Sequence, residues 1–103
     1  MDYQSLFGFF FEDLKVGQKA TMTRTITETD LRNFSGVCGD TNPMHLSEEF
    51  AQKTVFGGTI VHGFLTASLI SAVLSTKLPG PGSIYMSQTL RFTAPVRVGD
   101  TVF

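Results

Sequence analysis

The sequence predicts an α+β domain in which a long apolar helix packs against antiparallel strands. Residues from Phe64 to Leu78 are apolar on nearly all sides of a helix, which is typical of a buried helix. Residues 20–26 and 84–92 alternate apolar and polar side chains, and this period of two indicates half-buried strands. A chain of 103 residues has room for one domain, which we take to span residues 1–103.

The first part of the chain predicts an irregular lead-in, a strand and a helix, in that order. Residues 1–18 show no periodic pattern, and the alternation of a strand begins at Lys19. Thr27 precedes an acidic residue by three positions, which resembles a capping box with Asp in place of Glu or Gln. We therefore expect a helix over residues 28–37, with Gly39 as its stop.

The next segment predicts a loop between two helices. We expect the first helix to bury Leu31, Phe34 and Cys38 on its apolar side. Residues 40–43 (DTNP) favour a turn, because Asn and Asp suit turns and proline pushes the residue before it out of the helical region. Ser47 is a good N-cap for a short second helix with acidic residues in its first turn.

The last part of the sequence predicts too few strands to cover the apolar helix. Residues 79–82 (PGPG) stop the helix, and the second strand runs from Ser83 to Thr93. A turn at residues 98–101 leads into a third strand, and the sequence ends at Phe103. These strands leave an open edge and part of the helix uncovered. We therefore expect either strands from another chain or an incomplete domain, truncated after the start of the third strand.

Composition excludes several classes of protein. The chain is 42% hydrophobic and 17% charged, which argues against intrinsic disorder. Its net charge is −1, without a basic run that would bind a nucleic-acid backbone. The single cysteine and two histidines lack zinc-site spacing, so no metal is expected. The longest apolar stretch is shorter than the ~20 residues that cross a bilayer. We expect a soluble, cytoplasmic protein.

Asp40 and His45 are the first candidates for catalysis. They lie in one proline-containing loop, which can bring a carboxylate and an imidazole to the same small space. These two groups commonly move protons to and from water near neutral pH. The alternative is structural: an Asp at this position also bonds its own backbone in a turn, and a His here also serves in packing.

Residues at and within the apolar helix are the second set of candidates. Gly63 stands at the helix start, where free N–H groups attract negative charge and would polarise a carbonyl oxygen. His62 is either a second acid/base or the donor of a structural hydrogen bond to the loop. Ser71 bonds either a carbonyl one turn earlier or a carboxylate near the helix. The structural alternative for Gly63 is relief of crowding.

Five blocks of sequence occur together and carry a family resemblance. They are residues 39–45 (GDTNPMH), 56–58 (FGG), 60–63 (IVHG), 78–85 (LPGPGSIY) and 92–100 (FTAPVRVGD). This combination resembles the hydratase motif of MaoC-like, R-specific 2-enoyl-CoA hydratases, and the likeness extends from Phe11 onward. The resemblance implies a hot-dog fold, in which an antiparallel sheet wraps around a long central helix and two copies pair as a homodimer.

The resemblance also implies a reaction and roles for residues. Members of the family add water reversibly to trans-2-enoyl-CoA and form (R)-3-hydroxyacyl-CoA, a step in fatty acid metabolism and in the supply of polyhydroxyalkanoate precursors. The matching motif makes Asp40 and His45 the acid/base pair and the N–H of Gly63 the oxyanion donor. Asn42 would hold the loop, and Ser71 would support Asp40. The implied substrate is an acyl-CoA thioester, with no cofactor and no metal.

Three other interpretations are weighed from the sequence. A non-catalytic hot-dog partner subunit would give its sheet and helix to an active sibling chain, but it would not need Asp40, His45 and Gly63 together. A fragment of a multidomain acyl-CoA enzyme would retain this set. A hot-dog thioesterase would need a carboxylate on or beside the central helix, and residues 64–78 contain neither Asp nor Glu.

Overall fold

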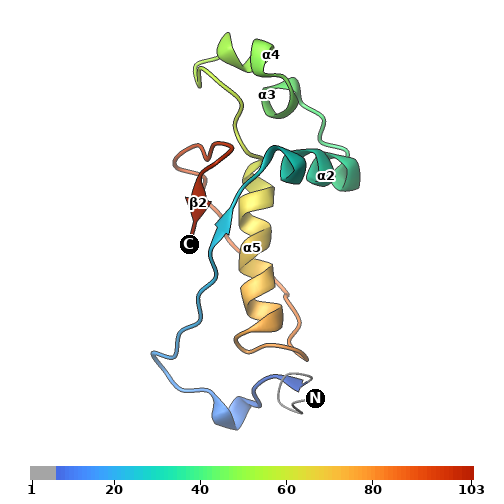
Figure 1. The fold of residues 1–103 in the computed structure, drawn as a ribbon. Helices are drawn as coiled ribbons and strands as arrows, with labels where there is room; N and C mark the ends of the chain where they lie inside the picture. The colour runs from blue at the N-terminus through green and yellow to red at the C-terminus, as the bar shows by residue number, and fades with distance from the viewer. Residues whose placement is uncertain (1–6) are drawn as a thin grey trace. The chain divides into compact units, whose positions relative to one another are not determined.

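The computed structural model describes residues 7–103, shown in Figure 1. The described residues form two compact units: unit 1 contains residues 7–22 and Ala67–Leu90, and unit 2 contains Thr23–Thr66 and Arg91–Phe103. Residues 1–6, the first part of the expected lead-in, lie outside the described residues. No helix within residues 7–103 is long and apolar enough to cross a membrane.

Helix α2 (Glu28–Cys38) confirms the helix predicted from its caps. The Thr27 hydroxyl accepts the Asp30 N–H at 3.2 Å, and the Asp30 carboxylate accepts the Thr27 N–H at 2.9 Å, which completes the capping box. The helix ends at Gly39, whose φ of 83° lies in the left-handed region that glycine adopts without strain.

The buried face of α2 differs in part from the expectation. Leu31 is buried and Phe34 is half-buried, as predicted for that face. Cys38 was expected to be buried and is exposed. The buried polar residue of the helix is Ser35 instead, which lies one turn after Leu31 and shares its face. Cys38 is the last residue of the helix, where its side chain contacts the following loop rather than the core.

Two short helices, α3 (Pro43–Leu46) and α4 (Glu48–Gln52), follow the first. The expected loop therefore ends at Asn42, whose side chain accepts the Met44 N–H at 3.0 Å and caps α3. Proline suits the first position of a helix, because the N–H that it lacks would have no acceptor within the helix there. This explains α3, which the sequence did not predict. Ser47 caps α4 as predicted, accepting the Phe50 N–H at 3.2 Å.

The sheet is smaller than the alternation of side chains predicted. Strands β1 (Arg24–Thr25) and β2 (Thr101–Val102) pair antiparallel, with Arg24 opposite Val102 (Figure 1). The expected strand over residues 83–93 contains no strand in the structure, and only two residues of the earlier one are paired. An extended segment becomes a strand only where a neighbour accepts and donates its backbone hydrogen bonds, and side-chain alternation does not supply that neighbour.

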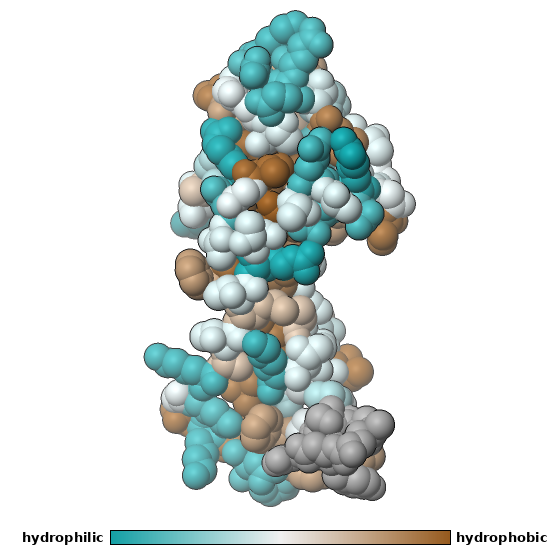
Figure 2. All heavy atoms as spheres, in the orientation of Figure 1, coloured by the Kyte–Doolittle hydropathy of each residue, from teal (hydrophilic) through white to brown (hydrophobic). Residues whose placement is uncertain are grey.

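Helix α5 (Gly63–Thr76) forms where an apolar helix was predicted, but it is not buried on all sides. Leu65 is its one fully buried residue, whereas Phe64 and Ile70 are 69% and 41% exposed. The described strands are too short to cover a helix of this length. Hydrophobic residues accordingly reach the surface, as Figure 2 shows for one face of the molecule.

The hydrophobic core of the described residues lies in unit 2. Its buried members come from the residue after β1, from α2, from α4, from the segment before α5 and from the start of α5: Ile26, Leu31, Ala51, Val61 and Leu65. Unit 1 is held instead by polar contacts of the backbone. The Phe9 N–H donates to the Pro79 carbonyl at 2.8 Å, and the Lys77 ammonium donates to the Thr21 carbonyl at 2.6 Å.

Candidate active site

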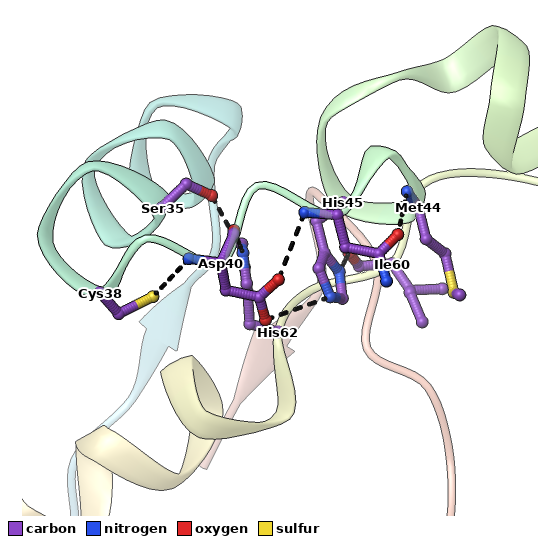
Figure 3. A network of polar contacts seen from close by, with 8 residues as sticks. Ser35, Cys38, Asp40, Met44, His45, Ile60 and His62 are labelled. Carbon is purple, nitrogen blue, oxygen red and sulfur yellow. Dashed lines mark hydrogen bonds and ion pairs between the residues drawn. The ribbon is translucent and has the colours of Figure 1, made fainter.

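Asp40, in the loop after α2, lies close to His45 of α3, as Figure 3 shows. One carboxylate oxygen of Asp40, Oδ1, accepts the Asn42 N–H at 3.3 Å. The other, Oδ2, lies 4.0 Å from Nε2 of His45. This distance is too long for a direct hydrogen bond, which spans about 2.7–3.2 Å. The Asp40 side chain is half exposed, whereas the His45 side chain is 12% exposed.

The His45 ring is held in one tautomer by the backbone. Its Nδ1 lies 2.8 Å from the carbonyl oxygen of Ile60. A carbonyl only accepts hydrogen bonds, so Nδ1 carries the hydrogen, and in the neutral ring Nε2 keeps its lone pair. Ile60 is itself fixed, because its N–H donates to the Met44 carbonyl and it forms an antiparallel bridge with Arg97. Two acceptor atoms, Nε2 and the Asp40 Oδ2, therefore face one another.

His62 lies beneath this pair and is 2% exposed. Its ring stacks on His45 with centroids 3.9 Å apart and an interplanar angle of 25°. Its Nε2 lies 3.1 Å from the Asp40 carbonyl oxygen and 3.0 Å from the Ser35 hydroxyl oxygen. The hydrogen bond to the loop that was one of the two interpretations of His62 is thus present.

Gly63 is the first residue of α5, so its N–H has no acceptor within the helix. A Cβ at this position would lie 3.0–3.1 Å from the ring atoms of Phe92, closer than side chains normally approach. The Phe92 ring, 54% exposed, lies beside Phe64 at a centroid distance of 6.0 Å. Glycine therefore allows the aromatic ring to pack against the start of α5.

Asn42 and Ser71 are the two other candidate residues, and only Asn42 contacts the Asp40–His45 pair. Asn42 joins the loop directly, donating its N–H to Asp40 and capping α3 through its side chain. Ser71 is exposed on the part of α5 that belongs to unit 1, whereas Asp40 belongs to unit 2. Among residues 7–103 the partners of the Asp40 carboxylate are Asn42 and His45. The support of Asp40 by Ser71 therefore stays a prediction.

A cavity of about 450 Å³ borders His45 on another side. Its rim includes Glu48, Thr59 and Arg97. The Thr59 hydroxyl and N–H both donate to Glu48 Oε2, at 2.6 and 3.0 Å, and these bonds hold the pKa of the Glu48 carboxyl below its ordinary value. The Arg97 guanidinium donates to the Phe56 carbonyl at 2.5 Å. These contacts fix the glycine-containing loop that leads to Ile60.

Asp40, His45 and His62 are also the residues that could hold a metal ion. Each offers one ligand atom, and these atoms lie within 4.8 Å of one another. The two histidine rings are stacked, with an interplanar angle of 25°. Nδ1 of His45 and Nε2 of His62 also contact protein oxygens already. The arrangement fits proton transfer better than metal binding.

Sequence reasoning missed two groups of this site. One is the Ser35 hydroxyl, which contacts His62 from α2, and the other is the Ile60 carbonyl, which orients His45. A signal for Ser35 was available, because it follows the buried Leu31 by four positions and so shares its helix face. No side-chain pattern marks a backbone carbonyl, so the part of Ile60 could be found only in the structure.

Comparison with known proteins gives consistent matches along the chain. The MaoC like domain family matches residues 12–103. An (R)-specific enoyl-CoA hydratase of Rhodospirillum rubrum is 54% identical over 102 residues, which is 99% of this chain and 71% of that protein. A 3-hydroxybutyryl-CoA dehydratase of Methylorubrum extorquens is 56% identical over 93 residues, which is 90% of this chain and 59% of that protein. The chain thus spans about three fifths to seven tenths of these curated relatives.

A solved structure shows the same architecture. The R-hydratase of Pseudomonas aeruginosa, in its unliganded form, matches with a TM-score of 0.87 and 50% identity. The match covers 93% of this chain and 62% of that one. The predicted fold class, a hot-dog domain built on a long helix and an antiparallel sheet, is confirmed by this match.

Proposed function

Because the chain belongs to the MaoC-like domain family, we propose that it acts in the reversible, R-specific hydration of trans-2-enoyl-CoA to (R)-3-hydroxyacyl-CoA. The substrate is an acyl-CoA thioester, in line with the names of its relatives. The reaction adds water to a double bond and transfers no electrons between protein and substrate. It therefore needs no redox cofactor, and proton transfer and charge stabilisation suffice.

The observation that carries this proposal is the 4.0 Å gap between Asp40 Oδ2 and His45 Nε2. A water molecule in that gap can lie about 2.8 Å from both atoms, which is ordinary hydrogen-bond length. Both atoms are acceptors, so the water donates one hydrogen to each. Its lone pairs are then free to attack carbon 3 of the enoyl group.

The electron movement follows from this position of the water. Its oxygen bonds to carbon 3, and the pair of the double bond moves through carbon 2 onto the thioester oxygen as an enolate. One of the two residues, Asp40 or His45, takes the water's proton as the bond forms. A proton is then returned to carbon 2, the enolate collapses to the thioester, and the (R)-3-hydroxyacyl product results. Positioned proton transfer of this kind contributes about 10²–10⁴ in rate.

The N–H of Gly63 is the proposed donor to the enolate oxygen. The first N–H groups of a helix have no internal acceptor, and the helix dipole there favours negative charge. An aligned donor is most valuable when charge has built up on the oxygen, which is the enolate stage. Asn42 would hold the loop in place, and Ser71 would support Asp40 from α5.

The test is hydration of crotonyl-CoA by the purified chain and by Asp40→Asn and His45→Gln variants. Each variant should lose about 10²–10⁴ of kcat/KM, because each removes one of the two acceptors of the water. Glu49→Gln is the matched control, since it neutralises an exposed carboxylate of α4 and should leave the rate unchanged. A folded Asp40→Asn variant that retains more than about a tenth of the rate would contradict the assignment.

We also propose that the chain associates, as a homodimer or higher homo-oligomer. The basis is the exposed apolar surface of α5 together with other large hydrophobic side chains, among them Phe10, Ile84, Met86 and Phe103. Large exposed apolar patches are unusual for a soluble monomer. Light scattering at low micromolar concentration should give a mass above that of one chain. A sharp monomer that unfolds cooperatively would contradict this proposal. We also propose a cytoplasmic location for the protein.

A further inference from the structure

We propose that His62 is a positioning residue for the Asp40–His45 pair, holding the backbone of one and supporting the ring of the other. This inference rests on the proposed function and deepens it. It concerns a residue that the proposed reaction leaves without a chemical step, although its side chain is among the most deeply buried in the described residues.

Burial keeps the His62 side chain away from the surface. The side chain is 2% exposed, and it lies beneath the pair, with a ring nitrogen within 4.8 Å of the Asp40 carboxylate and of a His45 nitrogen. Its ring has aromatic neighbours that fix its plane: Phe34 is tilted against it with centroids 4.9 Å apart, and His45 is stacked on it at 3.9 Å. A ring held in this way is a rigid support for the His45 imidazole.

The hydrogen bonds of His62 tie its ring to the loop. Nε2 carries the hydrogen, because the Asp40 carbonyl can only accept, and the Ser35 hydroxyl oxygen shares the same N–H. The other ring nitrogen, Nδ1, is buried and has no partner among residues 7–103. A hydrogen on that nitrogen would have no acceptor among these residues, so the hydrogen bonds described for the ring run through Nε2. The geometry therefore fits a donor that holds the loop.

The His62 side chain thus helps to fix the positions of both Asp40 and His45. The Asp40 backbone is held at 3.1 Å from Nε2, and the His45 ring lies on the face of the same imidazole. The 4.0 Å distance between Asp40 Oδ2 and His45 Nε2 consequently depends on where His62 lies. A misplacement of about 1 Å at a reacting group can cost about 10²-fold in rate.

Two substitutions separate the two contacts. His62→Phe keeps a ring for stacking and removes the N–H donor, whereas His62→Gln keeps an N–H donor and removes the ring. In crotonyl-CoA hydration, we expect kcat to fall about 10-fold in each variant and up to about 10²-fold in His62→Ala, which lacks both contacts. KM should stay within about threefold, because a positioning residue acts through the pair rather than on the substrate.

Controls distinguish positioning from loss of stability. Ile26→Ala removes another deeply buried side chain and should lower the midpoint of urea unfolding while leaving kcat of the folded protein unchanged. Ser35→Ala removes only the second acceptor of the shared N–H and should lower kcat less than His62→Phe does. If His62→Ala does not fold, the Phe and Gln variants still decide the question.

The outcomes separate this inference from the proposed function. If Asp40→Asn is inactive and folded His62→Ala retains kcat within about twofold, the positioning inference is wrong and the proposed function stands. A rise of KM in proportion to the loss of rate would also overturn it, because His62 would then act in binding. If Asp40→Asn is as active as the unchanged chain, the proposed function fails.

A readout without activity tests the positioning directly. The ring nitrogens of His45 can be followed by ¹⁵N NMR, where the structure predicts hydrogen on Nδ1 and none on Nε2 in the neutral ring. Replacing His62 by Phe or Gln should shift or broaden the His45 signals, because the ring loses either its support or the fixed loop beside it. Unchanged His45 signals in both folded variants would overturn the inference.

Discussion

The two units of this chain use the same helix in different ways. Residues 63–66 of α5 belong to unit 2, where Leu65 is 6% exposed and joins a core with Ile26, Leu31 and others. Residues 67–76 belong to unit 1, where Ile70 is 41% exposed and no hydrophobic side chain is fully buried among the described residues. The two stretches are similarly apolar. Burial of a helix is therefore decided by the neighbours that it meets, not by its own hydrophobicity.

The candidate site lies in the unit that is packed. Asp40, His45, His62 and Gly63 all belong to unit 2, and their contacts come from helix caps, short loops and one isolated bridge. None of these contacts requires an extensive sheet. The geometry of the Asp40–His45 pair is consequently defined by contacts within unit 2, whereas the apolar side chains of unit 1 remain exposed.

The largest effect that tests this comparison is expected at the start of α5. Gly63→Pro removes the N–H proposed to meet the enolate oxygen, and proline is tolerated at the first position of a helix. We expect kcat for crotonyl-CoA to fall by about 10²–10³, and substrate affinity to fall less.

Gly63→Ala is the matched control for this substitution. It adds the same Cβ near the Phe92 ring but retains the N–H. Its loss of rate measures crowding alone, and the difference between the two variants measures the donor. Equal losses in both variants would remove the oxyanion role from Gly63.

The second prediction compares the two halves of the helix directly. Leu65→Ala should lower the free energy of unfolding by about 2–5 kcal/mol, as for other buried leucines. Ile70→Ala should lower it by less than about 1 kcal/mol, because its side chain is largely in contact with water. Urea unfolding at a low protein concentration measures both values. A loss at Ile70 as large as that at Leu65 would mean that a second copy covers unit 1.

The smallest expected effect concerns Glu48, at the rim of the cavity beside His45. Hydrogen bonds from Thr59 lower the pKa of this carboxyl in the folded protein. The charged form thus stabilises the fold at pH values above the ordinary glutamate pKa, and the contribution is lost as the pH falls through the lowered one. Glu48→Gln should therefore show a weaker loss of stability below about pH 5 than the unchanged chain.

Glu49→Gln serves as the control for that measurement. Glu49 is the exposed neighbour of Glu48 and makes no side-chain hydrogen bond within residues 7–103. Its substitution should leave the acid dependence of thermal unfolding as it is. If both variants respond alike, the contact between Glu48 and Thr59 does not stabilise the loop.

The sequence predicted those features whose causes are local. The capping box at Thr27, the stop at Gly39 and the cap at Ser47 each depend on residues a few positions apart, and all three are present. The motif that pairs Asp40 with His45 is likewise local, and the structure brings the two side chains together. Such signals remain valid whatever the rest of the chain does.

Features that depend on distant partners could not be predicted in the same way. The alternating residues 84–92 have the pattern of a strand, but pairing requires a neighbour that no single segment encodes. The stacking of His62 on His45 joins the residue before α5 to a residue of α3, so neither local sequence predicts it. Cys38 was assigned to the core by its residue type, whereas its place at the end of α2 exposes it.

The hydrogen bond from His45 to the Ile60 carbonyl also has a consequence for folding kinetics. The turn that carries Asp40 and His45 needs only neighbouring residues, and helical segments of this kind form within microseconds. The Ile60 carbonyl is held in part by the pairing of Ile60 with Arg97, a contact between distant parts of the chain that forms more slowly. Until then, the hydrogen of His45 is free to exchange between its two nitrogens. In refolding, the single tautomer of His45 should therefore appear with the long-range bridge and after the helical signal.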